Sequence, residues 1–351
     1  MDKGVVNKIL VIRIDFLGDM VCTTPLLHAL RVRWPHAEIH VLANKYNAAV
    51  LENSKDINKI HYYVYSKNFQ KNIRPGFLHY LIDRAKLIVS LRKYKFDLLI
   101  IPNGGMNKNA IGFAKWLNVA DCRWHNADTE FDDRSQEHVA TRPMDHEALS
   151  GFKLLPELGV PDISQLRLYL QPRAELISAW RQRFKDKTKP RIGFFISNNN
   201  AARRWAWDKW QALTDKLAGD YELLIFHSPQ EHFPAGWRDG SSAQRISTPT
   251  VPELLAAMTQ LDCVVSADSA PVHFASALQI PVVALFESRP EKYLRWHPLG
   301  VKHIILHEGK RVEDIKVQSV FLAIQALFSD ESDQQNDISQ NQPAEAIACI
   351  A

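Results

Sequence analysis

The sequence has 351 residues, of which 46% are hydrophobic, and a formal net charge of +4. This length favours two domains, the hydrophobic content excludes a disordered chain, and no apolar run reaches the roughly 20 residues that span a bilayer. The four cysteines show no CxxC spacing, which argues against a zinc site or a disulfide framework and favours the cytoplasm as compartment.

The first half of the chain predicts a parallel sheet. Strands are expected over residues 8–14, 38–42 and 97–101, with helical patterns over 23–34 and 83–94 between them. This strand–helix–strand order is typical of a parallel sheet that helices cover on both faces. Further helices are expected over 107–117 and 146–158.

Residues 66–95 form the most basic segment, with eight Lys or Arg and one acidic residue, Asp83. Most charge runs are solvated helix faces. The segment also fits an anionic partner, either a phosphorylated acceptor or an anionic membrane surface. Nucleic acid is disfavoured because the chain has no zinc-finger spacing and no RNP-type motif.

A second strand–helix rhythm follows a connection rich in proline and charge. Strands are expected over 191–196, 221–226, 263–267 and 281–286, with helices over 208–217, 252–260 and 314–328 and one after the sequence DSAPVH. We therefore expect domains over 1–165 and 190–328, joined by 166–189. The acidic tail, 329–351, has no Lys or Arg and is expected to be disordered, and removing its five negative charges leaves the body at +9.

Loops at the carboxyl ends of parallel strands are the expected ligand site. The first such loop, after residue 14, holds Gly18 and Asp19. Asp19 could cap the following helix, or it could accept a proton from a hydroxyl nucleophile. Gly18 suits a tight turn or the close approach of a ligand. A single glycine is not the GxGxxG fingerprint of dinucleotide-binding proteins, and a P-loop is absent as well.

Two loops in the second half have the same placement. The loop after residue 196 contains Asn198, Asn199 and two adjacent arginines, which could neutralise a diphosphate without a metal ion or could form a solvated connection. The turn DSAPVH at 268–273 could be a well-capped helix start or a phosphate site at a helix N-terminus.

Three stretches together resemble glycosyltransferase family 9, the ADP-heptose:lipopolysaccharide heptosyltransferases. They are FLGDMVCTTPLLHALRVRWP, DHEALSGFKLLPELGV and LDCVVSADSAPVHFASALQIPVVALF, and the resemblance covers most of residues 8–300. It implies an α/β fold of GT-B type, with two Rossmann-like parallel-sheet domains facing a central cleft. The N-terminal domain would take the acceptor and the C-terminal domain the nucleotide-sugar, and the last helix could pack back on the N-terminal domain.

The resemblance also implies an inverting reaction without metal or other cofactor. Asp19 matches the family's catalytic base. The residues implied at the donor are Asn198, Asn199, Arg203, Arg204, Glu231, Asp268, Ser269, Ala270 and His273. The family often has lysine at position 203 and glycine at position 270. The residues that we place at the acceptor are Gly18, Lys67, Lys71, Arg74 and Asn103.

The expected function is transfer of heptose from ADP-heptose to the inner core of lipopolysaccharide. We expect this at the cytoplasmic face of the inner membrane, through peripheral contact and without nucleic acid. A GT-B glycosyltransferase with another donor or acceptor is the second interpretation, and a sugar-nucleotide-binding module without catalysis is the third. Asp19 argues against the third.

Overall fold

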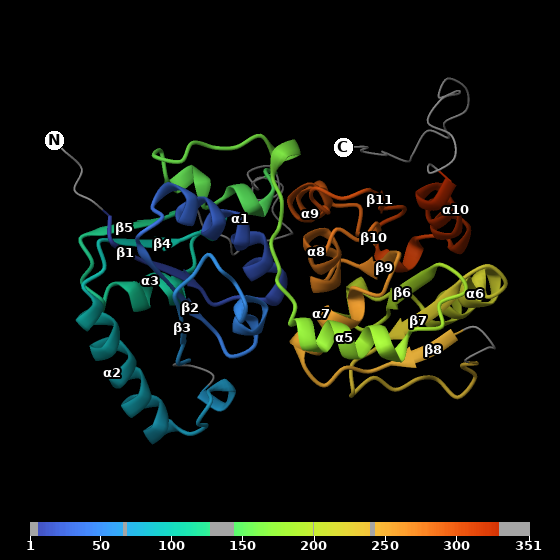
Figure 1. Ribbon diagram of the computed structural model, residues 1–351, viewed down its shortest axis with the longest axis horizontal. Helices are drawn as coiled ribbons and strands as arrows, with labels where there is room; N and C mark the ends of the chain where they lie inside the picture. Colours follow the sequence, from blue (N-terminus) through green and yellow to red (C-terminus); the bar gives the residue numbers. More distant parts are fainter. Residues whose placement is uncertain (1–5, 66–68, 127–143, 199, 239–242, 330–351) are drawn as a thin grey trace. The chain divides into compact units, whose positions relative to one another are not determined.

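The computed structural model describes residues 6–65, 69–126, 144–198, 200–238 and 243–329. The chain divides into two compact units, Met1–Gln171 and Pro172–Ala351, each built around one parallel sheet (Figure 1). The predicted tail lies outside the described residues except for Ser329, which ends the last helix. Part of the segment expected to connect the domains forms helix α5, Ala174–Arg183, which contacts α7 of the second unit.

The first unit has a five-stranded sheet in the order β3-β2-β1-β4-β5, and all its strand pairs are parallel. The strands are β1 (Lys8–Arg13), β2 (Glu38–Ala43), β3 (Lys59–Tyr62), β4 (Leu98–Ile101) and β5 (Asp121–Trp124). The strand order reverses between β1 and β4. In open parallel sheets this switch point opens a crevice at the carboxyl ends of the strands, where ligands bind.

The helices of the first unit are α1 (Leu17–Arg33), α2 (Phe77–Tyr94) and α3 (Lys108–Ala114). Short 3₁₀ turns are η1 (Asn47–Leu51), η2 (Phe69–Lys71), η3 (Glu147–Leu149), η4 (Phe152–Leu154) and η5 (Ile163–Gln165). The helix expected over 146–158 was therefore wrong, since η3 and η4 replace it. The helical turns end at Leu155, whose backbone leaves the helical region (φ −126°, ψ 80°) directly before Pro156.

The second unit has a six-stranded parallel sheet in the order β11-β10-β9-β6-β7-β8, with its switch point between β6 and β9. The strands are β6 (Arg191–Phe195), β7 (Glu222–Phe226), β8 (Ala243–Ile246), β9 (Cys263–Ala267), β10 (Val282–Leu285) and β11 (His303–Leu306). The helices besides α5 are α6 (Trp207–Leu217), α7 (Val251–Met258), α8 (Ala270–Ala277), α9 (Pro290–Trp296) and α10 (Val317–Ser329), with 3₁₀ turns η6 (Ala201–Arg203) and η7 (Val312–Asp314).

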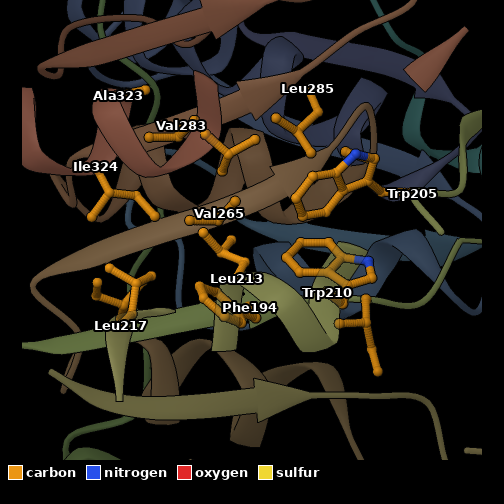
Figure 2. Close-up of a cluster of buried hydrophobic side chains, with 14 of the residues drawn as sticks. Phe194, Trp205, Trp210, Leu213, Leu217, Val265, Val283, Leu285, Ala323 and Ile324 are labelled. Atoms are coloured by element: carbon orange, nitrogen blue, oxygen red, sulfur yellow. The ribbon is translucent and has the colours of Figure 1, made fainter. Parts of the chain in front are cut away.

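Aromatic packing anchors the loop that follows β6. Trp205 and Trp210 meet edge to face with ring centres 4.8 Å apart, and Figure 2 shows both beside Phe194 and Leu213 in the core of the second unit. The indole of Trp205 also donates a hydrogen bond to the carbonyl of Ile315 at 2.9 Å. This buried anchor fixes the backbone directly after Arg203 and Arg204.

The last helix contacts elements of its own unit. The sequence left open whether the last helix packs back on the first domain. In the structure this helix, α10, packs against α6, β10 and β11. Within the described part of the chain, no helix has the length and apolar character that a membrane span requires.

Candidate active site

A buried arginine organises the carboxyl end of β1. The Arg13 side chain is only 1% exposed, and its Nη2 donates to Asp19 Oδ1 at 2.6 Å and to Glu147 Oε1 at 2.9 Å. Its Nε lies 3.2 Å from Asp15 Oδ2. Such a charge can be buried only when partners replace its hydration, and here three carboxylates do so. Sequence reasoning missed Arg13, Asp15 and Glu147 as site residues.

Asp19 has a carboxyl group whose pKa is raised to about 6. Burial is the largest cause, and the charges of Asp15 and Glu147 add to it, while Arg13 opposes the shift. Burial also lowers the pKa of the Arg13 guanidinium, but the three carboxylates outweigh this effect and raise it. The Asp19 side chain keeps 16% exposure, so a ligand can reach it. A carboxylate that titrates near neutrality suits proton transfer.

Asp19 does not cap its helix. Helix α1 begins at Leu17, so Asp19 lies inside its first turn, and the N-cap residue, Phe16, makes no side-chain capping bond. Gly18 also lies within α1 and has no positive φ, so the expected tight turn is wrong there. The side chain of Asp19 points its charge at Arg13 instead of the helix backbone.

Amide side chains hold the rest of this cluster. Asp15 accepts hydrogen bonds from Asn103 and, at 2.6 Å, from Asn107, both in the segment that follows β4 across the switch point. Asn44 donates to the carbonyls of Ile14 and Asp15 at 2.9 and 2.6 Å. The predicted residues Asp19 and Asn103 are thus joined through Arg13 and Asp15, and Asn103 Oδ1 is buried without a hydrogen-bond partner among the described residues.

The second unit places a basic loop at its own switch point. Asn198 donates to the backbone carbonyl of Asp268 at 3.1 Å, which joins the loop after β6 to the end of β9. Arg203 Nη1 lies 3.1 Å from Asp268 Oδ2. Burial raises the pKa of Asp268, and Arg203 opposes this shift. Asn199 lies outside the described residues.

A cavity of about 500 Å³ lies beside this loop. It is lined by Ser197, Arg204, Trp207, Ser228, Gln230, Glu231 and His232. Arg204 Nη1 lies 3.5 Å from Glu231 Oε1, so the two predicted residues meet at the cavity wall. A larger cavity, about 600 Å³, lies at the opposite, amino ends of β6, β9 and β10. We assign the ligand to the smaller one because ligands of parallel sheets collect at carboxyl ends.

Helix α8 begins directly after the turn that follows β9, without a side-chain cap. Ser269 is the N-cap residue by position, but its side chain makes no capping bond to α8 and donates instead to the carbonyl of Ala267 at 3.0 Å. Of the two interpretations of this turn, the helix start capped by a side chain is therefore wrong. In the first turn of α8, Pro271 has no N–H group and the N–H of Val272 donates to the carbonyl of Ser269 at 3.1 Å. The N–H of Ala270 and the positive end of the helix dipole are what this turn offers to an anionic ligand. His273 is buried against Trp296, and burial lowers its pKa to about 4, so its ring is neutral near pH 7.

Charged residues after β10 complete the cluster, and sequence reasoning missed them. Arg289 Nη2 lies 2.9 Å from Glu287 Oε1, and Arg203 Nε lies 4.0 Å from the same oxygen. Burial lowers the pKa of Lys292, and the charges of Arg203 and Arg289 lower it further. The sequence feature that could have identified these residues is the charged stretch ESRPEK, which follows an apolar strand directly and so lies at the same end of the sheet as the other loops.

The expected basic acceptor residues lie elsewhere in the first unit. Arg74 pairs with Asp83 of α2, with Nε 2.9 Å from Oδ2, and Lys71 is exposed at the end of η2. Lys67 lies outside the described residues. Among those described, no group of three or more His, Cys, Asp or Glu side chains could hold a metal ion.

Comparisons with known proteins agree with one another. Residues 84–322 match the model of glycosyltransferase family 9 (heptosyltransferase). The chain is 24% identical over 299 residues to lipopolysaccharide heptosyltransferase 3 of Escherichia coli, which covers 81% of this chain and 84% of that protein.

Two solved structures share the fold. A family 9 glycosyltransferase of Veillonella parvula DSM 2008 has a TM-score of 0.71 and 19% identity, covering 92% of this chain and 98% of that one. The E. coli heptosyltransferase WaaC, solved with ADP-2-deoxy-2-fluoro heptose, has a TM-score of 0.65 and 14% identity, covering 91% and 99%. The fold class expected from the sequence, two parallel-sheet α/β domains of GT-B type, is confirmed.

Proposed function

Since this chain belongs to glycosyltransferase family 9 and is a glycosyltransferase related to the lipopolysaccharide heptosyltransferases, we propose that it transfers heptose from ADP-heptose to the inner core of lipopolysaccharide. The reaction is inverting, proceeds without a metal ion and takes place at the cytoplasmic face of the inner membrane. The relative WaaC, solved with an ADP-heptose analogue, supports the choice of donor.

The observation that carries the proposal is the Asp19 carboxylate, which titrates near pH 6 and is partly exposed. In this mechanism an acceptor hydroxyl oxygen attacks the anomeric carbon of the donor while its proton passes to Asp19. The bond from that carbon to the diphosphate oxygen breaks, and ADP leaves. One displacement of this kind inverts the anomeric configuration. Arg13 fixes the position of the base through the 2.6 Å contact.

The donor is assigned to the second unit. Arg203 and Arg204 would neutralise the diphosphate, and the N–H of Ala270 at the start of α8 would donate to one of its oxygens. Glu231, at the wall of the cavity of about 500 Å³, would accept hydrogen bonds from the nucleotide. Arg203 and Lys292 lie with Asp268 in one cluster. Positive charge that is fixed in place stabilises a departing diphosphate without having to reorganise.

The test is direct transfer. The purified chain is incubated with ADP-heptose and a set of truncated, deacylated inner-core acceptors, and mass spectrometry reads the addition of one heptose. Asp19→Asn should lose activity by about 10²–10⁴-fold while it keeps ADP affinity. Near-normal turnover of this variant would remove Asp19 from the role of base.

The proposal that the reaction needs no metal ion has a separate test. Activity should persist in excess EDTA, and Arg203→Ala should lower the rate by on the order of 10²-fold without rescue by Mg²⁺. Arg238→Ala is the matched control, because Arg238 forms an exposed pair with Asp215 in the same unit. Loss of wild-type activity in EDTA with recovery in Mg²⁺ would contradict the proposal.

A further inference from the structure

Helix α2 carries an apolar stripe that faces solvent. Leu78, Ile82, Ala85 and Val89 follow one another at intervals of four, three and four residues, which places them on one side of the helix. Leu78 is 72% exposed, Ile82 49% and Val89 53%. A contiguous apolar surface of this kind marks an interaction site more often than isolated exposed residues do.

The opposite side of α2 already serves the core of the first unit. Leu91 is the one residue of α2 that is fully buried, and Leu87 and Ile88 pack against the same cluster. The stripe is therefore a second apolar face, and the packing of the unit does not need it. In Figure 1, α2 extends away from the sheet of its unit, with its N-terminal end farthest from the strands.

Positive charge flanks the stripe. Lys86 and Lys93 are exposed along one edge of it, and Arg92 lies along the other. The single acidic residue of α2, Asp83, is paired with Arg74. An apolar face bordered by lysine and arginine is the pattern of a helix that lies in a membrane interface, with its side chains among acyl chains and its charges at anionic headgroups.

We propose that α2 is a membrane-docking helix, which inserts the stripe of Leu78, Ile82, Ala85 and Val89 into the surface of a bilayer that contains anionic phospholipid. A second copy of the chain fits the same face less well, because Lys86 and Lys93 would meet like charges across a two-fold contact. The inference deepens the proposed function, since a lipid-linked acceptor is presented at such a surface.

The apolar arm of the test uses flotation of the full chain with lipid vesicles. The chain should bind vesicles of phosphatidylcholine and phosphatidylglycerol and should bind pure phosphatidylcholine about tenfold more weakly. A triple variant, Leu78→Ser, Ile82→Ser and Val89→Ser, should lose binding by tenfold or more. The control variant is Val32→Ser with Leu322→Ser. These two apolar residues are 67% and 52% exposed on other helices, so the control variant should bind vesicles as the wild type does.

The charge arm separates the headgroup contribution. Lys86→Gln with Lys93→Gln should weaken binding to the anionic vesicles by on the order of tenfold and leave the weak binding to pure phosphatidylcholine unchanged. The control is Arg181→Gln with Lys185→Gln, an exposed pair of positive charges in the second unit, which should have little effect.

Three outcomes would overturn the inference. The first is a wild-type chain that does not bind anionic vesicles, and the second is a serine variant that binds them as well as the wild type does. The third is a wild-type chain that is a dimer in analytical ultracentrifugation and a serine variant that is a monomer, which would make the face a contact between copies. Transfer to a deacylated acceptor in solution should be equal in the wild type and the serine variant. If the wild type shows no transfer at all, the proposed function fails while the vesicle result still decides the docking helix.

Discussion

At the scale of single residues, Arg13 ties the proposed base to the fold. Its guanidinium is surrounded by Asp15, Asp19 and Glu147, so the cluster holds more negative than positive charge when all three carboxylates are ionised. Burial raises the pKa of the Asp19 carboxyl group to about 6, and the negative charges of Asp15 and Glu147 add to the shift while Arg13 opposes it. The unusual pKa thus follows from burial together with the composition of the cluster.

A pH profile tests this consequence. Asp19 can accept a proton only when it is ionised, so kcat/KM should fall tenfold per pH unit as the pH drops below about 6. The groups that face it are Arg13, Asp15 and Glu147. The rate of transfer to a deacylated acceptor is measured between about pH 4.5 and about pH 8. This range contains the raised pKa of about 6 and extends close to the ordinary aspartate pKa. A fall that starts only near the ordinary aspartate pKa, about 4, would contradict the raised pKa.

Glu147→Gln should move this acidic limb to lower pH. Glu147 raises the pKa of Asp19 by its charge, and glutamine keeps an oxygen for Arg13 and for the N–H of Gly104 while removing that charge. Glu157→Gln is the control, because Glu157 pairs with Arg123 in the same unit. If the acidic limb of the pH profile is unchanged in Glu147→Gln, Glu147 does not set the pKa of Asp19 and has only a structural role.

Only part of this residue-scale cluster could be read from the sequence. Asp19 and Gly18 stand at the junction of a strand and a helix, where ligand loops are expected. Arg13 interrupts an apolar run, a sign that a buried charge needs a partner. Its partner Glu147 is 134 residues away along the chain, in a segment predicted as helix, so no local pattern joined the two.

At the scale of elements, the strands that were predicted and those that were missed differ in position. All seven interior strands were predicted, whereas the four edge strands, β3, β5, β8 and β11, were missed. Interior strands of a parallel sheet are covered on both faces, so their sequences are apolar runs. Edge strands are less covered, so their sequences need not be apolar. Three of the missed sequences, KIHY, DCRW and AQRI, contain charged or polar residues accordingly, whereas the fourth, HIIL of β11, is apolar after its first residue and is an exception.

The turn at Gly151 gives an element-scale prediction. An added Cβ would run into Leu26, which lies on the helix that carries Asp19, and would approach Pro102 Cβ to 3.0 Å. The backbone there, φ −69° and ψ −33°, suits alanine, so the effect is one of packing. Gly151→Ala should lower the free energy of unfolding by about 1–3 kcal/mol.

Gly112 of α3 is the matched control for that substitution. Space is open around it, and alanine favours helix, so Gly112→Ala should raise the free energy of unfolding by about 0.5–1 kcal/mol. Equilibrium urea unfolding of the two variants beside the wild type measures both effects. Equal stability of the Gly151 and Gly112 variants would show that the neighbours of Gly151 give way freely.

At the scale of the whole molecule, the two units repeat one plan with different chemistry. Each has a parallel sheet whose switch point carries polar loops, but the first presents an Arg-bound carboxylate cluster and the second a cluster of arginines with an adjoining cavity. This plan was visible in the sequence as two rounds of strand, polar loop and helix. The carboxylates that balance Arg203 and Arg289 were less visible, because Asp268 and Glu287 follow different strands.

The last prediction follows from that division of chemistry between units. Substitutions in the first unit should act on the acceptor and those in the second unit on the donor. Lys71→Ala with Arg74→Ala should raise the KM for a phosphorylated, lipid-linked acceptor by about threefold to tenfold, since each exposed charge contributes under about 1 kcal/mol. Their KM for ADP-heptose should stay within error of the wild type.

Arg204→Ala and Glu231→Gln should show the reverse pattern, because both line the cavity of the second unit. The KM for ADP-heptose should rise by about tenfold for either variant, as expected when one charged partner of a ligand is removed, with little change for the acceptor. The measurement is a full matrix of initial rates in which both substrates are varied for all variants. If variants from one unit raise both KM values equally, the assignment of one substrate to each unit is wrong, even if transfer itself is confirmed.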